Sequence, residues 1–191
     1  MIAGLVYTST GHFRIPGPSA TLGVNAAFSL PPPSTFRGFL QSMIGRYDEL
    51  DGQFAYGITK HGSLSSSILQ KTIAYSSSMK NGGSRPVIKP IMYGQYYKFL
   101  FEGPDEERFK AFLEGRAKRS GALYLGESYN LCRVVSSDTN LEEVDWVCPD
   151  EDGSLRLITK AFRGWDTSHL AEYGTFSLRS VDSSNNIPWM K

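Results

Sequence analysis

The sequence predicts an α+β fold whose strands and helices follow the order β-α-β-β-α-β. Two stretches with apolar residues at helical period alternate with runs rich in aromatic and β-branched residues, and glycine and proline separate them. The chain has 191 residues, of which 40% are hydrophobic and 13% aromatic. A chain of this length buries roughly 70% of the surface that it exposes when unfolded, so we expect a substantial core.

The first strand is predicted over 3–15, "AGLVYTSTGHFRI", where an apolar run gives way to Thr, Gly and Arg. The next segment, 16–28, contains Gly17, Pro18 and Gly23. Glycine and proline at this density are typical of turns, so we expect a loop with a short return.

The first helix follows in "FSLPPPSTFRGFLQSMIG", residues 28–45. Its apolar residues have helical spacing and predict one buried stripe, formed by Phe36, Phe39, Leu40, Met43 and Ile44. We expect Ser34 at the N-cap, where its hydroxyl can hold a free backbone N–H, and Gly45 at the end of the helix. Gly38 costs about 1 kcal/mol relative to alanine inside a helix. It therefore has a reason, which is either a close approach to the backbone or a packing requirement.

Two further strands are predicted over 53–61, "QFAYGITKH", and over 90–103, a run rich in Tyr and Phe. The intervening stretch, 62–88, holds eight serines and an "NGG" turn signal around short β-prone runs. This composition predicts a long hairpin or arm that projects from the body. A flexible loop is the alternative.

The second helix opens with Pro104 and three acids, which suit the positive end of a helix dipole. Its expected core face is Phe109, Phe112 and Leu113, and its end is basic, with Arg116, Lys118 and Arg119. A fourth strand is predicted over 122–135, "ALYLGESYNLCRVV". The order of these elements is that of a ferredoxin-like fold.

We therefore expect a ferredoxin-like domain over 1–135, with a β-hairpin inserted at about 62–88. A short β-rich C-terminal part, 136–191, is expected to pack on it. This part begins with an acidic loop, 136–153. Two strands are predicted after it, in "SLRLITKAF" and "GTFSLRSV".

Charge is distributed unevenly, although the formal net charge is only +1. There is no Asp or Glu from Met1 to Tyr47 or from Gly52 to Phe101, whereas Asp138 to Asp152 carries seven acids and no base. Such asymmetry indicates an anionic partner on the basic side. Chance clustering on a solvated surface is the alternative.

Several chemistries have no motif in the sequence. It contains no phosphate-binding loop, nucleophile elbow or dinucleotide fingerprint. The three histidines, His12, His61 and His169, are scattered and are expected at the surface, so we predict no metal and no cofactor. Cys132 and Cys148 form no paired motif, which favours reduced thiols and the cytoplasm. No run approaches the ~20 apolar residues of a membrane span, and the first residues do not resemble a signal peptide.

The basic insertion offers a surface for RNA. Cations neutralise phosphates, and aromatic or long apolar side chains stack on bases or wedge between them; the insertion provides Lys71, Tyr75, Met79, Lys80, Arg85 and Lys89. The start of the first helix adds backbone N–H groups at Ser34 and Thr35, which favour phosphate. A merely solvated hairpin and a simple helix cap are the alternatives.

The first strand and the "PPPSTFRG" run resemble the N-terminal signature of CRISPR-associated family five, in the RAMP superfamily of ferredoxin-like RNA-binding proteins. In that family a Pro-Pro-Ser/Thr-x-x-Gly run opens the first helix, and Pro32, Pro33, Ser34 and Gly38 match it. "YLGESYNLCRV" (124–134) resembles the family's Leu-Gly strand, and "YGTFSLR" (173–179) is similar to its closing segment.

The resemblance implies a non-catalytic subunit that caps the 5′ handle of the guide RNA in a type I Cascade complex. It also implies a hairpin thumb at 62–88, contacts with the Cascade backbone and large subunits, and target DNA passing nearby close to its recognition motif. The residues expected to bind RNA are Arg14, Ser34, Thr35, Arg37, Lys60, Lys71, Tyr75, Met79, Lys80, Arg85 and Lys89.

Two other functions fit the sequence. One branch of the family cleaves precursor guide RNA without metal, and His61 with Lys60 or Tyr56 could supply the acid–base groups that such a reaction requires. The other alternative is a protein-interaction module whose basic surface meets an acidic protein.

Overall fold

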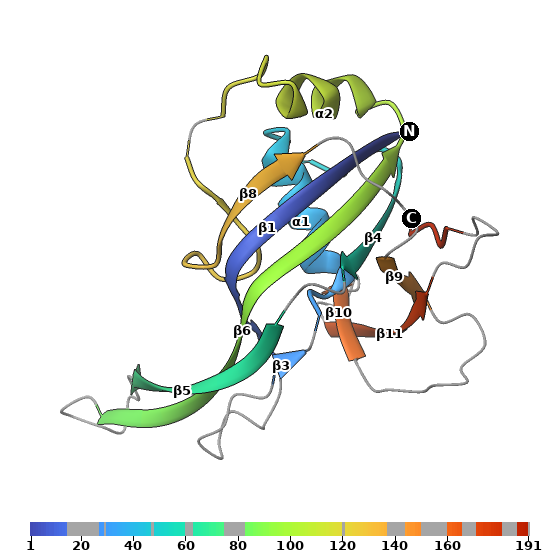
Figure 1. The fold of residues 1–191 in the computed structure, drawn as a ribbon. Helices are drawn as coiled ribbons and strands as arrows, with labels where there is room; N and C mark the ends of the chain where they lie inside the picture. Colours follow the sequence, from blue (N-terminus) through green and yellow to red (C-terminus); the bar gives the residue numbers. More distant parts are fainter. Residues whose placement is uncertain are drawn as a thin grey trace.

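The computed structural model describes residues 1–14, 27–28, 30–46, 48–59, 63–74, 83–119, 121–136, 144–149, 160–165, 171–180 and 187–190 (Figure 1). The helices are α1 (Pro33–Met43) and α2 (Glu106–Leu113). The strands are β1 (Ile2–Gly11), β2 (Phe13–Arg14), β3 (Ala27–Phe28), β4 (Gln53–Thr59), β5 (Ser63–Ala74), β6 (Gly83–Glu102), β7 (Leu123–Tyr124), β8 (Leu131–Ser136), β9 (Val144–Pro149), β10 (Lys160–Trp165) and β11 (Ala171–Ser180). None of the helices in these ranges is long and apolar enough to cross a membrane.

The central strands lie in the order β4-β6-β1-β8, and every neighbouring pair is antiparallel. Helix α1 connects β1 to β4, and α2 connects β6 to β8. This arrangement is the ferredoxin-like fold that the order of elements predicts. The sheet continues beyond β4 through β9, β11 and β10, so the C-terminal strands extend the same sheet.

Within the stretch 62–88, the described residues 63–74 and 83–88 form the two strands of the predicted hairpin. Strand β5 pairs with the first half of β6 from Ser63↔Tyr93 to Ala74↔Gly83. The second half of β6 lies in the centre of the sheet, between β1 and β4. One strand of twenty residues therefore runs from the hairpin into the core, and the hairpin projects away from the body (Figure 1).

The N-cap of helix α1 lies two residues earlier than its sequence suggests. Pro32 occupies the N-cap position and makes no side-chain capping bond, so the expected N-cap at Ser34 is wrong. Proline fits the first turn because its missing N–H would have no helical partner there. The expected end is confirmed: Gly45 has φ +69°, and the N–H groups of Gly45 and Arg46 donate to Ser42 and Gln41 in a Schellman arrangement.

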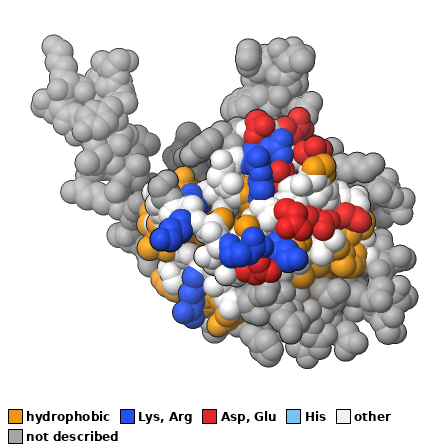
Figure 2. Space-filling model, turned by 90° about the horizontal axis from the view of Figure 1, so that it is seen from above, with side chains coloured by type: hydrophobic (Ala, Val, Ile, Leu, Met, Phe, Trp, Pro, Cys, Tyr) orange, Lys and Arg blue, Asp and Glu red, His pale blue; other side chains and the backbone are white. Residues whose placement is uncertain are grey.

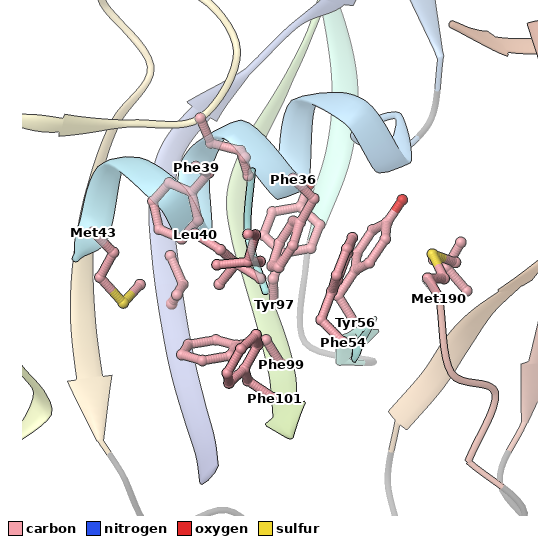
Figure 3. Close-up of a cluster of buried hydrophobic side chains, with 14 of the residues drawn as sticks. Phe36, Phe39, Leu40, Met43, Phe54, Tyr56, Tyr97, Phe99, Phe101 and Met190 are labelled. Carbon is pink, nitrogen blue, oxygen red and sulfur yellow. The ribbon is translucent and has the colours of Figure 1, made fainter. Parts of the chain in front are cut away.

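The predicted stripe of α1 packs on the sheet (Figure 3). Four residues of α1 are buried: Phe36, Phe39, Leu40 and Met43. They meet aromatic side chains of β4 and β6, namely Phe54, Tyr56, Tyr97, Phe99 and Phe101. The closest ring pair joins the helix to the sheet, because Phe36 stacks on Tyr56 with centroids 4.2 Å apart and planes 8° apart. Such a pair contributes about 0.5–1.5 kcal/mol beyond its burial.

Helix α2 covers the other end of the same face. Its fully buried residue, Phe109, packs on Phe99 and Phe101 at centroid distances of 6.0 and 4.6 Å. Phe112 and Leu113 are partly buried against the same cluster, as predicted. The helix ends at Leu113, so the basic residues 116–119 lie in the following loop.

Two expected boundaries are wrong in the C-terminal half. The stretch 122–135 is two short strands, β7 and β8, which pair as a hairpin around residues 125–130. Gly126 has φ +83°, which permits the turn, and the Leu125 N–H donates to the Asn130 carbonyl. The expected acidic loop contains β9, because Val144, Trp146 and Val147 are buried despite the neighbouring acids.

The proline run is held by a buried tyrosine. The Tyr56 hydroxyl donates to the Pro31 carbonyl at 2.6 Å. Tyr97 lies in the same cluster, but its buried hydroxyl has no hydrogen-bond partner among the described residues. Burial raises the pKa of both phenols. Both hydroxyls therefore stay protonated in the folded chain. Because each phenol ionises more readily in the unfolded chain, the free energy of unfolding falls only as the pH rises above about 10.

These two tyrosines give a matched test. We expect Tyr56→Phe to lower the free energy of unfolding by about 1–3 kcal/mol, because the Pro31 carbonyl loses its partner. Tyr97→Phe should be neutral or stabilising, since it removes a hydroxyl that is not satisfied. Urea denaturation measures both. Equal losses from the two substitutions would show that the bond to Pro31 does not stabilise the fold.

Candidate nucleic-acid interface

The outer face of α1 is the floor of a groove. Two adjoining hollows, of about 700 and 320 Å³, share Gly38, Ser42 and Tyr124 in their walls. The smaller hollow is lined by Ser34 and Thr35 near the start of α1 and by Gly126 of the turn between β7 and β8. We call the combined feature the α1 groove. Its floor includes the small residues Ser34, Thr35, Gly38 and Ser42 together with Gln41, because the large apolar side chains of α1 point into the core.

Gly38 keeps this groove open. A Cβ placed on Gly38 would have no other atom within 4 Å, so no packing contact requires glycine here. Of the two reasons considered from the sequence, close approach to the backbone is the one that remains. A side chain at this position would project into the groove.

The larger hollow is lined by four basic residues. Two come from the ends of helices and two from the loop after α2: Arg46, Arg108, Lys118 and Arg119. Asp105 pairs with Arg46 and lies 3.8 Å from the Nε atom of Arg108. Arg46 also pairs with Asp48, and this hydrogen bond is the main cause of the lowered pKa of Asp48. Lys118 and Arg119 therefore carry most of the positive charge that is left for a ligand.

One guanidinium nitrogen of Arg119 makes no hydrogen bond within the described part of the chain. Its Nη1 atom is buried and has no hydrogen-bond partner among the described residues. A buried donor without a partner costs about 1–3 kcal/mol, more if it is charged. Because Arg119 lines the larger hollow, a phosphate bound there would lie beside its guanidinium and could accept from this nitrogen once a side-chain movement uncovers it.

Tyr124 adds an aromatic wall to the groove. It belongs to β7, is 44% exposed and lines both hollows. An exposed ring beside cations provides a surface on which bases stack. Figure 2 shows the face that bears α2, where most basic side chains lie at the left and centre of the described surface and most acidic ones at the top and right, with both signs side by side at the centre and the top.

The groove brings together only part of the predicted RNA-binding set. Ser34 and Thr35 line it. Arg37 lies elsewhere on α1, with its guanidinium carbon 5.7 Å from the centre of the Phe54 ring, and lines a shallower hollow that also holds Glu49 and Glu102. Arg37 therefore lies in a different hollow from Ser34 and Thr35, although all three belong to α1.

Lys89 has an unexpected place. Its side chain is 3% exposed, its ammonium pairs with Glu127, and it lies 4.5 Å from the centre of the Tyr129 ring. The Tyr129 hydroxyl donates to Glu127. Contact between Lys89 and RNA would require this arrangement to open. In the structure it ties the base of the hairpin to the loop between β7 and β8.

The other predicted RNA-binding residues are not described in enough detail to compare. Only the backbone is described for Arg14, Lys71 and Arg85. Lys60, Tyr75, Met79 and Lys80 lie outside the described residues.

The groove residues that sequence reasoning missed are Arg46, Arg108, Lys118, Arg119 and Tyr124. The basic run at 116–119 is visible in the sequence, but there it fits the favourable end of a helix dipole. Its role in the groove depends on the loop that carries it past α1.

One histidine corrects the sequence analysis. His12 is 1% exposed, so the expectation of a surface position is wrong, and its Nδ1 atom lies 2.7 Å from the Pro90 carbonyl. This bond holds the end of β1 against the base of the hairpin. His61 and His169 lie outside the described residues.

The described cysteines are both free thiols. Burial raises the pKa of Cys132 to about 11, which keeps this thiol protonated at neutral pH. In the described ranges, no three His, Cys, Asp or Glu residues gather as metal ligands do.

No protein-family model and no curated protein matches the sequence. A solved structure does match: it is a chain of a "CRISPR RNA-guided surveillance complex", with a TM-score of 0.59 and 12% sequence identity. The match covers 94% of this chain and 89% of that chain. At this identity the likeness concerns the fold, and it extends over nearly the whole of both chains.

A substitution at Gly38 should separate stability from binding. We expect Gly38→Ala to stabilise the fold by up to about 1 kcal/mol, because alanine favours the helix and meets no other atom. Gly38→Gln should remain folded, since its side chain extends into the groove. Both should weaken RNA binding, the larger residue more strongly.

Thermal unfolding and filter binding measure the two effects, and Lys110→Gln on the exposed face of α2 is a control outside the groove. Unchanged RNA binding by a folded Gly38→Gln variant would exclude the α1 groove as a binding site.

Proposed function

We propose that this chain is a non-catalytic RNA-binding subunit of a type I CRISPR Cascade complex and caps the 5′ handle of the guide RNA. The observation that carries the proposal is the α1 groove, which is lined by the cations Lys118 and Arg119 and by the exposed ring of Tyr124. Phosphates would lie against the cations, and an unpaired base would stack on the tyrosine.

Two other observations support this function. The fold resembles a chain of a CRISPR RNA-guided surveillance complex over 94% of its length. The hairpin of β5 and β6 occurs where the family-five resemblance expects a thumb, and the chain from Gly52 to Phe101 has no acid to repel RNA. In this proposal the hairpin brackets the RNA, and backbone and large subunits contact the chain in the cytoplasm.

RNA that copurifies with the chain provides the direct test. We expect guide RNAs whose 5′ ends share one repeat-derived sequence, because a capping subunit selects the handle rather than the variable part. Sequencing of the bound RNA measures this. Bound RNA with unrelated 5′ ends would contradict the capping role.

The groove cations should control the salt dependence of RNA binding. We expect Lys118→Gln with Arg119→Gln to reduce the slope of log affinity against log salt by roughly 0.7 for each lost phosphate contact. Lys110→Gln, which removes an exposed charge from α2 outside the groove, should leave the slope unchanged. Equal slopes for the wild-type chain and the double variant would place the phosphates elsewhere.

The ribonuclease alternative leads to a different result. Metal-independent cleavage works best with a group that titrates near neutral pH, for which histidine is suited. His12 is buried and bonded to a carbonyl. Of the other two histidines, His61 has a cation, Lys60, beside it in the sequence, so His61 is the residue to test. We expect no cleavage of a precursor repeat RNA by the wild-type chain. Cleavage at one site that His61→Ala abolishes would make the chain a processing enzyme.

A further inference from the structure

A row of planar side chains crosses the face of the sheet opposite α1. Val6 and Tyr97 point into the core beneath the helix, so the alternation of strand side chains directs their neighbours Tyr7 and Tyr96 to the other face. Tyr7 and Tyr96 are direct partners in the β1–β6 pair, and their ring centroids lie 4.9 Å apart. Arg133 of β8 is the partner of Tyr7 on its other side, with its guanidinium carbon 5.1 Å from the centre of the Tyr7 ring. We call Tyr96, Tyr7 and Arg133 the sheet-face row.

The row lies on the open part of this face. Arg133 is exposed, and both tyrosines are half-buried. Leu131 and Val135, which alternate with Cys132 and Val134 along β8, are 52% and 45% exposed. Toward β4 the face is closed by a second cluster, formed by Ala55, Leu100, Val144 and Trp146 with Ile187 and Trp189 packed against it. In Figure 1, β8, β1 and β6 lie in front of α1, so this face of the sheet is turned toward the reader.

The chemistry of the row suits an unpaired base. Aromatic rings and guanidinium planes are the surfaces on which single-stranded bases stack. Arg133 also supplies a charge for phosphate. There is no acid in β1 or β8, and the single acid of β6 is its last residue, Glu102, so these strands offer little repulsion to a polyanion.

The α1 groove and the row lie on either side of one sheet edge. Tyr124 of β7 lines the groove and pairs with Leu131 of β8. β8 in turn pairs with β1, which carries Tyr7. From β7 to β1 there are two strand spacings, or about 10 Å. An RNA strand that leaves the groove past Tyr124 therefore reaches the row by passing over a short edge.

We propose that the sheet-face row is a second RNA subsite, which stacks an unpaired base of the strand held in the α1 groove. This inference rests on the proposed RNA-binding function and adds where a base leaving the groove is held. An alternative occupant is a protein that covers Leu131 and Val135, and the experiment below treats it as an outcome that overturns the proposal.

Photocrosslinking tests the row in the wild-type chain. A short single-stranded oligouridine in which 5-iodouridine replaces uridine is irradiated with the full chain, and the modified peptides are mapped by mass spectrometry. Because iodouridine reacts with aromatic rings that stack on it, adducts on Tyr7 or Tyr96 are expected. Adducts confined to other residues would overturn the proposal.

Substitutions distinguish stacking from burial and charge. We expect Tyr7→Leu and Tyr96→Leu each to weaken oligouridine binding by roughly 5- to 150-fold, the range for loss of one base–aromatic stack. Tyr7→Phe and Tyr96→Phe retain the ring and should bind as the wild type does. These phenylalanine variants are the matched controls, because they remove only the hydroxyl.

The salt slope separates this proposal from the groove. The leucine variants should retain the wild-type slope, because no phosphate contact is lost, whereas Lys118→Gln with Arg119→Gln should reduce it. If folded leucine variants bind like the wild type, the row is not an RNA subsite, even if the groove variants lose affinity. The same result, together with loss of assembly with partner subunits, would assign the face to a protein. If the wild-type chain binds no RNA at all, both proposals fail.

Discussion

The contact between Phe36 and Tyr56 sets the position of α1 on the sheet. It joins the first turn of α1 to β4, with the two rings nearly parallel and 4.2 Å apart. The hydroxyl of the same tyrosine holds the Pro31 carbonyl. One side chain thus fixes both the helix and the proline run that leads into it, and the rigid φ of the prolines limits the directions that the helix can take.

The groove is a consequence of that orientation. Because the large apolar side chains of α1 are directed into the sheet, its groove face carries the small residues Ser34, Thr35, Gly38 and Ser42, with Gln41 as the longer polar side chain. A backbone with so little side-chain cover can be approached closely by a ligand. The turn between β7 and β8 and the loop after α2 then bring Tyr124 and the cations to the edges of this face. The side of α1 that faces away from the sheet, with mostly short side chains, therefore forms the floor of the groove.

The hairpin is attached to the body by polar contacts at its base. His12 bonds to the Pro90 carbonyl, and Lys89 pairs with Glu127 beneath the Tyr129 ring. A buried ammonium that loses its partner is costly, so these contacts restrain the direction in which β5 and β6 leave the sheet. The contact to Glu127 also links the hairpin to the turn that borders the α1 groove, because Gly126 lines that groove. The hairpin and the groove therefore share one structural support.

The amino-acid sequence predicts the order of the elements, the buried stripe of α1 and the glycine that ends it, because these depend on residues within a few positions of one another. It also indicated the hairpin, whose turn signals and acid-free composition are local. Long-range packing forms the α1 groove, in which Gly38, Arg119 and Tyr124 line one hollow. It also forms the sheet-face row, where Tyr7 lies beside Tyr96 and Arg133. It also turned Lys89 inward toward Glu127. These contacts join residues far apart in the chain, and strand register and sheet order bring them together through forces that no local pattern records.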